Sequence, residues 1–256
     1  MLFVIDIGNT NTVLGVYQES RLIAHWRLET KQSQTADEYG ILARNLFALA
    51  DIEFTKIHAM VIASVVPPLN SVLEQMALKY FKVKPLFIEP GVKTGMPVLY
   101  DSPADVGADR IVNGVAAYDK YGGPCIVVDF GTATTFDAIS PKGEYLGGVI
   151  TPGPGISAEA LFTRTARLPR VEIKVPSKVI GTSTVGSIQS GLYYGYIGLI
   201  DGVLERMIHE LGPKTTVVAT GGYASLIGGG TQRIQHIDLD LTLEGLRLIY
   251  EKNRVK

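Results

Sequence analysis

A turn motif that occurs twice in the sequence limits the folds that this chain can adopt. The stretch MLFVIDIGNTNTVLG opens the chain and CIVVDFGTATTFDAI begins near its middle; in both, an apolar run ends in Asp-x-Gly and small polar residues follow. The two aspartates, Asp6 and Asp129, are 123 residues apart (129 − 6) in a chain of 256 residues. A repeat at half the chain length predicts two folding units of one design.

The elements expected around the two turns come in one order. In the first half, the pattern predicts strands at residues 2–7, 12–18, 21–28, 58–66 and 85–89, with helices at 35–50, 67–81 and about 104–121. In the second half it predicts strands at 125–130, 134–139, 143–150 and 215–220, with helices after residue 153, at about 182–211 and at about 241–252. Three meandering strands followed by alternating helices and strands form a mixed sheet covered by helices. We therefore predict an α/β fold of two halves, 1–121 and 122–256.

The repeated turn has the chemistry of a phosphate site. Glycine lets backbone N–H groups approach an anion closely, and the neighbouring Thr and Asn side chains add short donors. Asp6 stands where it would hold Mg²⁺ through water, since Mg²⁺ prefers one or two carboxylates together with phosphate oxygens. One such turn alone would be read as an ordinary hairpin. Two copies at equivalent places favour a triphosphate bound by both.

Two other nucleotide motifs are absent or weak. The chain contains no G-x-x-x-x-G-K-[ST], which excludes a P-loop site. GPGISA at 153–158 satisfies the dinucleotide pattern G-x-G-x-x-A, with Glu172 at about the right distance. The strands before it form a meander, however, and Pro154 lies inside the motif. We interpret it as a strand-to-helix turn.

The predicted helix SPADVGADRIVNGVAAY, at 102–118, is the strongest candidate for a second substrate. Asp105, Asp109 and Asn113 are spaced four apart and would share one helix face. Arg110 adds a planar fork suited to a carboxylate or phosphate. A solvated acidic face is the alternative; Gly107 argues against it, because an exposed helix has no reason to carry the entropic cost of glycine.

Composition removes several classes of partner. The net charge is −1 and basic residues are scattered, so nucleic acid is not expected. No apolar run approaches the length of a membrane span, and the start of the chain does not resemble a signal peptide, so we expect a soluble, cytoplasmic protein. The four histidines match no metal-ligand spacing, and the single Cys125 is expected to be a buried hydrophobe.

The architecture resembles the superfamily of actin, hexokinase and Hsp70. In that superfamily two ribonuclease-H-like halves clamp ATP in the cleft between them, through hairpin turns for the phosphates and a glycine pair after a strand for adenosine. Gly221 and Gly222 in VVATGGY match the glycine pair. The resemblance implies a nucleotide cleft between two such halves.

Within that superfamily the chain resembles the type III pantothenate kinases over its whole length. The motifs are D-x-G-N-T at 6–10, Tyr100, G-A-D-R at 107–110, D-x-G-T-A-T-T-x-D at 129–137, GGVITPG at 147–153 and T-V-G-S-I-Q-S-G at 184–191. Ser183 departs from the Asn that the family often carries there. The resemblance implies transfer of the γ-phosphoryl group of ATP to pantothenate, which gives 4′-phosphopantothenate in the first step of coenzyme A synthesis.

The resemblance also implies roles for single residues. Asp109 would accept the proton of the substrate hydroxyl, and Asp129 would hold the monovalent cation, K⁺ or ammonium, that the family requires. The pantothenate site would consist of Tyr100, Gly107, Ala108, Asp109, Arg110 and Thr184, the last from the same subunit or from a partner subunit. The ATP site would consist of Asp6, Ile7, Gly8, Asn9, Thr10, Asn11, Thr12, Val13 and Thr132, with Mg²⁺ at Asp6.

Glycines in the predicted helix at 182–211 bear on assembly. Gly191, Gly195, Gly198 and Gly202 lie on one helical face, and each costs roughly 0.5–1 kcal/mol relative to alanine. Close approach of another helix would compensate, either from the same chain or from a second copy. The family resemblance implies a homodimer.

Two other functions stay open at this point. One is a regulatory member of the fold that binds ligand without turnover, although Asp6, Asp109 and Asp129 are all present. The other is another small-molecule kinase or phosphatase of the superfamily, which the G-A-D-R segment disfavours.

Overall fold

The computed structural model describes residues 1–254, which form two compact units. The first comprises Met1–Gly95, Asp101–Ala116 and the C-terminal segment from Thr242; the second comprises Met96–Tyr100 and Ala117–Leu241. The predicted halves, 1–121 and 122–256, concern the duplicated order of elements and stay a prediction. The packing of the chain differs from that division, because the C-terminal helix joins the first unit.

A five-stranded mixed sheet forms the centre of the first unit. Its spatial order is β3-β2-β1-β4-β5, with β1 antiparallel to β2 and parallel to β4. The strands are β1 (Leu2–Ile7), β2 (Asn11–Gln18), β3 (Arg21–Glu29), β4 (Ala59–Ser64) and β5 (Leu86–Phe87). β1 and β4 are apolar and buried along most of their length, as expected for central strands whose two faces are both covered.

Two helices complete the core of this unit. They are α1 (Ala36–Leu49) and α2 (Pro67–Met76), which continues as the π-helical turn η2 (Ala77–Phe81). The predicted capping box of α1 is confirmed: the Thr35 hydroxyl accepts from the Glu38 N–H, and the Glu38 carboxylate accepts from the Thr35 N–H. Phe47 of α1 packs edge-on against Phe3 of β1, with ring centroids 5.1 Å apart.

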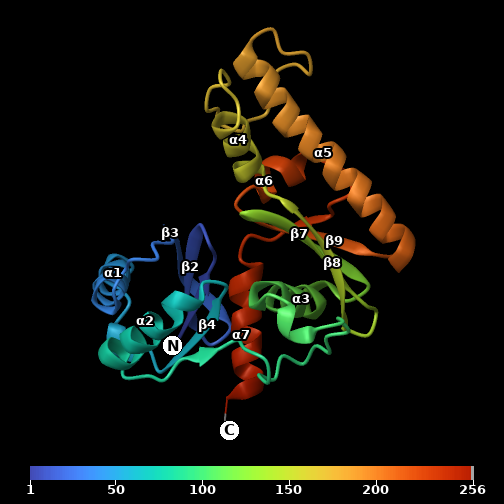
Figure 1. Cartoon of the computed structure of the whole chain (residues 1–256). Coiled ribbons are helices and arrows are strands. Elements are labelled where there is room, and N and C mark those ends of the chain that lie inside the picture. Colours follow the sequence, from blue (N-terminus) through green and yellow to red (C-terminus); the bar gives the residue numbers. More distant parts are fainter. Residues whose placement is uncertain (255–256) are drawn as a thin grey trace. The chain divides into compact units, whose positions relative to one another are not determined.

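The second unit repeats the first. Its sheet has the order β10-β9-β6-β7-β8, with β6 antiparallel to β7 and parallel to β9. The strands are β6 (Cys125–Phe130), β7 (Ala133–Ile139), β8 (Tyr145–Pro152), β9 (Thr216–Gly221) and β10 (His236–Ile237). The helices are α4 (Pro154–Thr163), α5 (Thr184–Leu211) and the short α6 (Ala224–Ile227), labelled in Figure 1. Because β6 takes the place of β1 and β9 that of β4, the predicted pair of mixed sheets is confirmed.

Cys125 begins the buried strand β6, as expected. Its side chain is fully buried, and burial raises the pKa of the thiol to about 12. Among residues 1–254, no helix is both long and apolar enough to cross a membrane.

Two further helices, α3 (Ala108–Tyr121) and α7 (Leu241–Asn253), pack together through the parts that belong to the first unit, up to Ala116 in α3 and from Thr242 in α7. A Cβ on Gly245 would collide with the backbone carbonyl of Val112, so the helices meet backbone to backbone. The Thr242 hydroxyl adds a 2.7 Å hydrogen bond to Oδ1 of Asn113. α7 thus fixes the position of the N-terminal part of α3.

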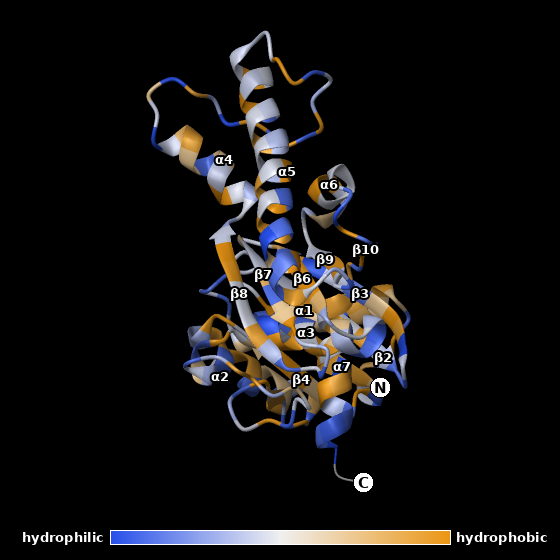
Figure 2. Ribbon diagram, turned by 90° about the vertical axis from the view of Figure 1, so that its right-hand side faces the viewer, coloured by the Kyte–Doolittle hydropathy of each residue, from blue (hydrophilic) through white to orange (hydrophobic). Residues whose placement is uncertain are grey.

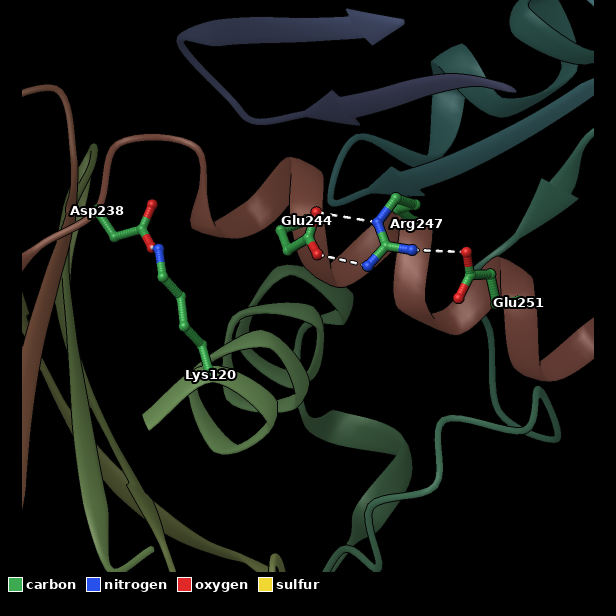
Figure 3. A network of polar contacts seen from close by, with 5 residues as sticks. All are labelled: Lys120, Asp238, Glu244, Arg247 and Glu251. Carbon is green, nitrogen blue, oxygen red and sulfur yellow. Dashed lines mark hydrogen bonds and ion pairs between the residues drawn. The ribbon is translucent and has the colours of Figure 1, made fainter. Parts of the chain in front are cut away.

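An ion-pair cluster on α7 stabilises that helix. The Arg247 guanidinium is buried; its Nε and Nη2 donate to Glu244 at 3.0 and 2.5 Å, and its Nη1 donates to Glu251 at 2.6 Å (Figure 3). These carboxylates raise the pKa of the guanidinium above its usual value. In the second unit, Lys120 at the end of α3 pairs with Asp238 at 2.6 Å.

The predicted start of α3 at about residue 104 is wrong. Pro103–Asp105 form a separate 3₁₀ turn, Val106 is extended, and the helix begins at Ala108. The reason is local: with φ −76° and ψ 122°, Val106 breaks the helical hydrogen-bond ladder. Asp105 therefore does not lie on the α3 face that carries Asp109.

Candidate functional site

The first Asp-x-Gly turn joins β1 to β2 at the carboxyl end of β1. The Gly8 N–H donates to the Asn11 carbonyl at 2.9 Å, and the three polar residues Asn9, Thr10 and Asn11 are exposed. β4 runs parallel to β1 and ends beside it, since the Val65 N–H donates to the Ile7 carbonyl at 3.0 Å. The end of a central strand thus presents a loop of exposed polar groups, as a phosphate turn requires.

Thr12 differs from the other polar residues of this turn. Its side chain is fully buried and its hydroxyl lies 2.9 Å from the Thr30 hydroxyl. The residue therefore anchors β2 to the end of β3. Any contact between Thr12 and a phosphate would have to come from its backbone.

The second turn joins β6 to β7 and is one residue shorter. Thr12 faces Ile7 across the first hairpin, and Thr134 faces Phe130 across the second. Thr134 is therefore the structural counterpart of Thr12, at an offset of 122 residues (134 − 12), whereas Asp129 and Asp6 are offset by 123 (129 − 6). Gly131 and Thr132 are exposed in this turn, and the Gly131 N–H donates to the Ala133 carbonyl at 3.0 Å.

Two glycines from other parts of the second unit enclose this turn. The Gly153 N–H donates to the Thr132 carbonyl at 3.0 Å, and a Cβ on Gly153 would collide with the Thr132 and Gly131 carbonyls. Gly221, at the end of β9 with φ +93°, has no room for a Cβ beside Oδ1 of Asp129. The GGY motif therefore brings backbone close to the Asp129 carboxylate, whose oxygens are ligands that a hard cation prefers.

The interpretation of GPGISA is confirmed. β8 lies antiparallel to β7 and leads into α4 through Gly153, so the segment does not open a βαβ unit. Its first glycine is needed for close packing under the second turn.

The segment 107–110 forms the first turn of α3. The Gly107 carbonyl accepts from the Arg110 N–H at 3.1 Å, so Gly107 precedes the helix as its capping residue. A Cβ on Gly107 would stand 2.6 Å from Oδ1 of Asp109, and the missing side chain is what leaves room for the carboxylate. This differs from the sequence argument, which placed Gly107 inside the helix.

Within this turn, the surroundings of Asp109 shift the pKa of its carboxyl. Its Oδ1 accepts from the Arg110 N–H at 2.9 Å, a bond that favours the charged form. Burial is the larger effect and raises the pKa of the Asp109 carboxyl above its ordinary value of 3.8. Arg110 itself is buried. The turn holds a carboxylate that is a stronger base than a solvated aspartate.

The other two substrate residues lie in the second unit. Tyr100 is 38% exposed and its ring centroid lies 6.3 Å from that of Tyr145. Thr184 begins α5 and is exposed. It lines a cavity of about 850 Å³ together with Leu161, Leu168, Gly181, Thr182, Ser183, Ser187, Ile188, Gly191 and Leu192.

Among the residues that the structure describes, no group of three or more His, Cys, Asp or Glu side chains is arranged to bind one metal ion. Single carboxylates such as Asp6 and Asp129 fit cations that take their other ligands from phosphate, backbone or water.

Sequence reasoning missed a buried polar pair beside Tyr100. The Tyr145 hydroxyl donates to Oδ1 of Asp137 at 2.8 Å, and both side chains are fully buried. The available signal was an aspartate inside an apolar strand, which closes the motif D-x-G-T-A-T-T-x-D.

Solved structures identify the class of fold. The chain aligns over 98% of its length with 98% of a Campylobacter jejuni protein assigned to the Baf family of transcriptional activators, at TM-score 0.62 and 22% identity. It aligns over its full length with 98% of a Sinorhizobium meliloti protein assigned as a 2-dehydro-3-deoxygalactonokinase, at TM-score 0.59 and 11% identity. It also aligns over its full length with 98% of the activator of 2-hydroxyisocaproyl-CoA dehydratase from Clostridium difficile, which was solved with bound ADPNP, at TM-score 0.52 and 13% identity. With its two equivalent mixed sheets, the chain has the fold of the actin-like ATPases and sugar kinases.

Sequence relatives narrow that class to one family. The family model for type III pantothenate kinase matches residues 2–206. Curated type III pantothenate kinases of Koribacter versatilis and Myxococcus xanthus are 62% and 59% identical to the chain, which covers 96% and 99% of them with 99% of its own length. The chain belongs to the type III pantothenate kinase family.

Proposed function

We propose that this protein transfers the γ-phosphoryl group of ATP to the primary hydroxyl of pantothenate, which yields 4′-phosphopantothenate and ADP. Membership in the family supports this reaction. The structural observation that carries it is the first turn of α3, where Gly107 leaves room for a partly buried Asp109 carboxylate of raised pKa. This reaction is the first step of coenzyme A synthesis.

Asp109 is the proton acceptor in this proposal. The hydroxyl oxygen of pantothenate bonds to the γ-phosphorus while the bond from that phosphorus to the bridging β-γ oxygen breaks. The hydroxyl proton passes to Asp109 late, because the transition state of phosphoryl transfer is loose and the oxygen needs little prior activation. The raised pKa of Asp109 improves it as an acceptor, and Arg110 offers a bidentate partner to the pantothenate carboxylate. Tyr100, Gly107, Ala108 and Thr184 line the rest of the acceptor site.

The two Asp-x-Gly turns bind ATP. The residues of the first turn are Asp6, Ile7, Gly8, Asn9, Thr10, Asn11, Thr12 and Val13, and Thr132 is that of the second. The exposed amides and side chains of Asn9, Thr10 and Asn11 support the assignment, as does exposed Thr132. Asp6 would hold Mg²⁺ through water, and Asp129 would hold K⁺ or ammonium. When bound, the two cations neutralise charge on the phosphates.

The enzyme is a homodimer in this proposal, with α5 in the interface. Apart from the nearby backbone of α5 itself, a Cβ on Gly191, Gly195 or Gly198 would meet no atom of the described residues within 4 Å. The alternative of a partner helix from the same chain therefore loses its support. Figure 2 shows α5 pale along much of its length, in keeping with its Gly, Ser and Tyr content. Large apolar side chains nearby in the sequence are also exposed: Ile156, Phe162, Val179, Ile180 and Val185. We place the enzyme in the cytoplasm, where MgATP is available.

The reaction is tested by mass spectrometry of purified protein with MgATP, K⁺ and pantothenate. Wild-type protein should give phosphopantothenate, and Asp109→Asn almost none while still binding ATP. A folded wild type that binds ATP and forms no product would refute the kinase assignment and favour a regulatory role. Replacing K⁺ by Na⁺ should lower the rate, and the same rate in both salts would contradict the cation assignment.

Light scattering tests the dimer. Wild type should have twice the mass of the chain, and Gly195→Glu should lower it to that of a monomer. Leu49→Glu changes an exposed apolar residue of the first unit and should leave the dimer intact. A dimeric Gly195→Glu variant would exclude α5 from the interface.

A further inference from the structure

Asp137 is a buried carboxylate to which the proposed reaction assigns no step. It lies in the middle of β7, opposite Gly148 of β8, and is fully buried. A carboxylate in such a place is costly unless hydrogen bonds compensate. The Thr135 hydroxyl donates to its Oδ2 at 3.0 Å and the Tyr145 hydroxyl to its Oδ1 at 2.8 Å. The hydrogen bond from its hydroxyl to Asp137 fixes the orientation of the Tyr145 side chain.

Tyr145 in turn holds the segment that carries Tyr100. Its backbone N–H donates to the Pro97 carbonyl at 2.8 Å, and its carbonyl accepts from the Leu99 N–H at 2.8 Å. Val98 and Tyr145 form a parallel bridge. The segment Met96–Tyr100 thereby packs with the second unit, although the residues on either side of it belong to the first.

The Tyr145 ring also borders that of Tyr100. The two ring planes meet at 58°, with centroids 6.3 Å apart. On the other side, Gly147 has φ +124°, and Cδ2 and Cε2 of Tyr100 lie 3.5 Å from where its Cβ would stand. The backbone of Gly147 and the ring of Tyr145 thus define where Tyr100 lies.

We propose that Tyr145, held by Asp137, is a positioning residue for the acceptor substrate. It fixes Tyr100 at the pantothenate site and so sets the affinity for pantothenate without touching the substrate. The inference rests on the proposed function, because Tyr100 matters only if the acceptor binds there. It assigns a role to the last aspartate of D-x-G-T-A-T-T-x-D.

Steady-state kinetics of Tyr145→Phe test the proposal. This variant keeps the ring and removes only the hydroxyl bound to Asp137. The KM for pantothenate should rise about tenfold, equivalent to about 1.4 kcal/mol. The kcat and the KM for ATP should stay within about twofold, because neither phosphate turn is altered. The matched control is Tyr118→Phe, which removes a hydroxyl 3.4 Å from the Pro141 carbonyl in the same unit and should leave both KM values unchanged.

A merely structural role would give another result. In that case Tyr145→Phe lowers the melting temperature and the active fraction, and hence kcat, but leaves the KM for pantothenate unchanged; this outcome overturns the proposal. In a Tyr100→Leu background, Tyr145→Phe should add no further rise in that KM, since coupled residues are not additive. A full second rise shows that Tyr145 does not act through Tyr100 and also overturns it.

Two outcomes separate this inference from the function on which it rests. A wild type that forms no phosphopantothenate refutes both the proposed function and this inference. If the wild type is active and Tyr145→Phe has the same KM for pantothenate, only the inference about Tyr145 is refuted. Amide hydrogen exchange adds a reading independent of activity: the Leu99 N–H should exchange faster in Tyr145→Phe than in wild type, and equal rates contradict the proposed anchoring.

Discussion

The contact of Gly245 with α3 allows a prediction that links packing to catalysis. A Cβ at this position would overlap the Val112 carbonyl oxygen and stand 2.7 Å from Cγ1 and 2.8 Å from the carbonyl carbon of that residue. Ordinary contacts begin at 3.4 Å. In Gly245→Ala, therefore, α3 and α7 must move apart by about 1 Å, since close-packed interiors yield little elsewhere.

The energetic and catalytic effects of this change differ in size. Overpacking costs about 1–3 kcal/mol, and alanine returns about 1 kcal/mol of helix propensity. The net loss is about 0–2 kcal/mol, which lowers the melting temperature by at most about 8 °C. Asp109 lies three residues before Val112, within one turn of the same helix. A shift of about 1 Å at a reacting group can reduce the rate about 100-fold.

The assay is kcat and KM for pantothenate phosphorylation by Gly245→Ala, next to thermal unfolding of the same protein. We expect a folded protein with about 1% of wild-type kcat/KM. Gly229→Ala is the control, because a Cβ there meets nothing within 4 Å. Wild-type kinetics in Gly245→Ala would refute the reasoning. Restoration of activity by an added Val112→Ala would also refute it, since that change relieves the side chain but not the carbonyl.

Three further predictions concern stability. Burial raises the pKa of the Asp109 carboxyl in the folded protein. The charged form of Asp109 therefore lowers the free energy of unfolding. This loss is fully present above the raised pKa and absent below about pH 3.8, where the carboxyl is protonated in both states. Asp109→Asn should therefore be more stable than wild type at pH 7 by denaturant unfolding, with a gain that shrinks as the pH falls towards 4. Thr134 is fully buried and its hydroxyl has no hydrogen-bond partner within the described residues, so Thr134→Val should raise stability by about 1 kcal/mol, seen as a melting temperature about 2–4 °C higher. Arg247→Met leaves Glu244 and Glu251 without their partner; both are a third or more exposed, so the loss should be about 2 kcal/mol by urea unfolding, below that of a fully buried pair.

Each of these predictions has an outcome that would contradict it, and the last two have control variants. A pH-independent gain for Asp109→Asn would exclude ionisation as its cause. Thr242→Val removes a hydroxyl that does have a partner and should destabilise the protein; an equal rise in both threonine variants would contradict the argument. Arg170→Met breaks an exposed pair with Glu159 and should cost less than about 0.5 kcal/mol, so a loss as large as that of Arg247→Met would contradict the role of burial.

Local patterns in the sequence predicted the order of elements and the chemistry of the turns. The capping box at Thr35, the apolar runs of β1 and β6 and the length of α5 each depend on residues close together in the chain. Periodicity and capping are therefore enough to find them. The duplicated Asp-x-Gly turn likewise implied two equivalent sheets, and the sheets have the same strand order.

Contacts between distant segments were decided only by the tertiary structure. A constant offset of 123 residues would make Thr135 the counterpart of Thr12 (12 + 123), whereas the hairpin register makes Thr134 its counterpart, because one turn is a residue shorter. Gly245 is an ordinary glycine in the sequence, and Gly221 stood out there only as one of the glycine pair. Neither has room for a Cβ, because Val112 and Asp129 approach them from far along the chain. The link from Asp137 through Tyr145 to Tyr100 was equally invisible, since nothing in the local pattern of β7 or β8 specifies which loop lies beside them. Short-range propensity selects the elements and their order, and long-range packing selects which of their residues meet.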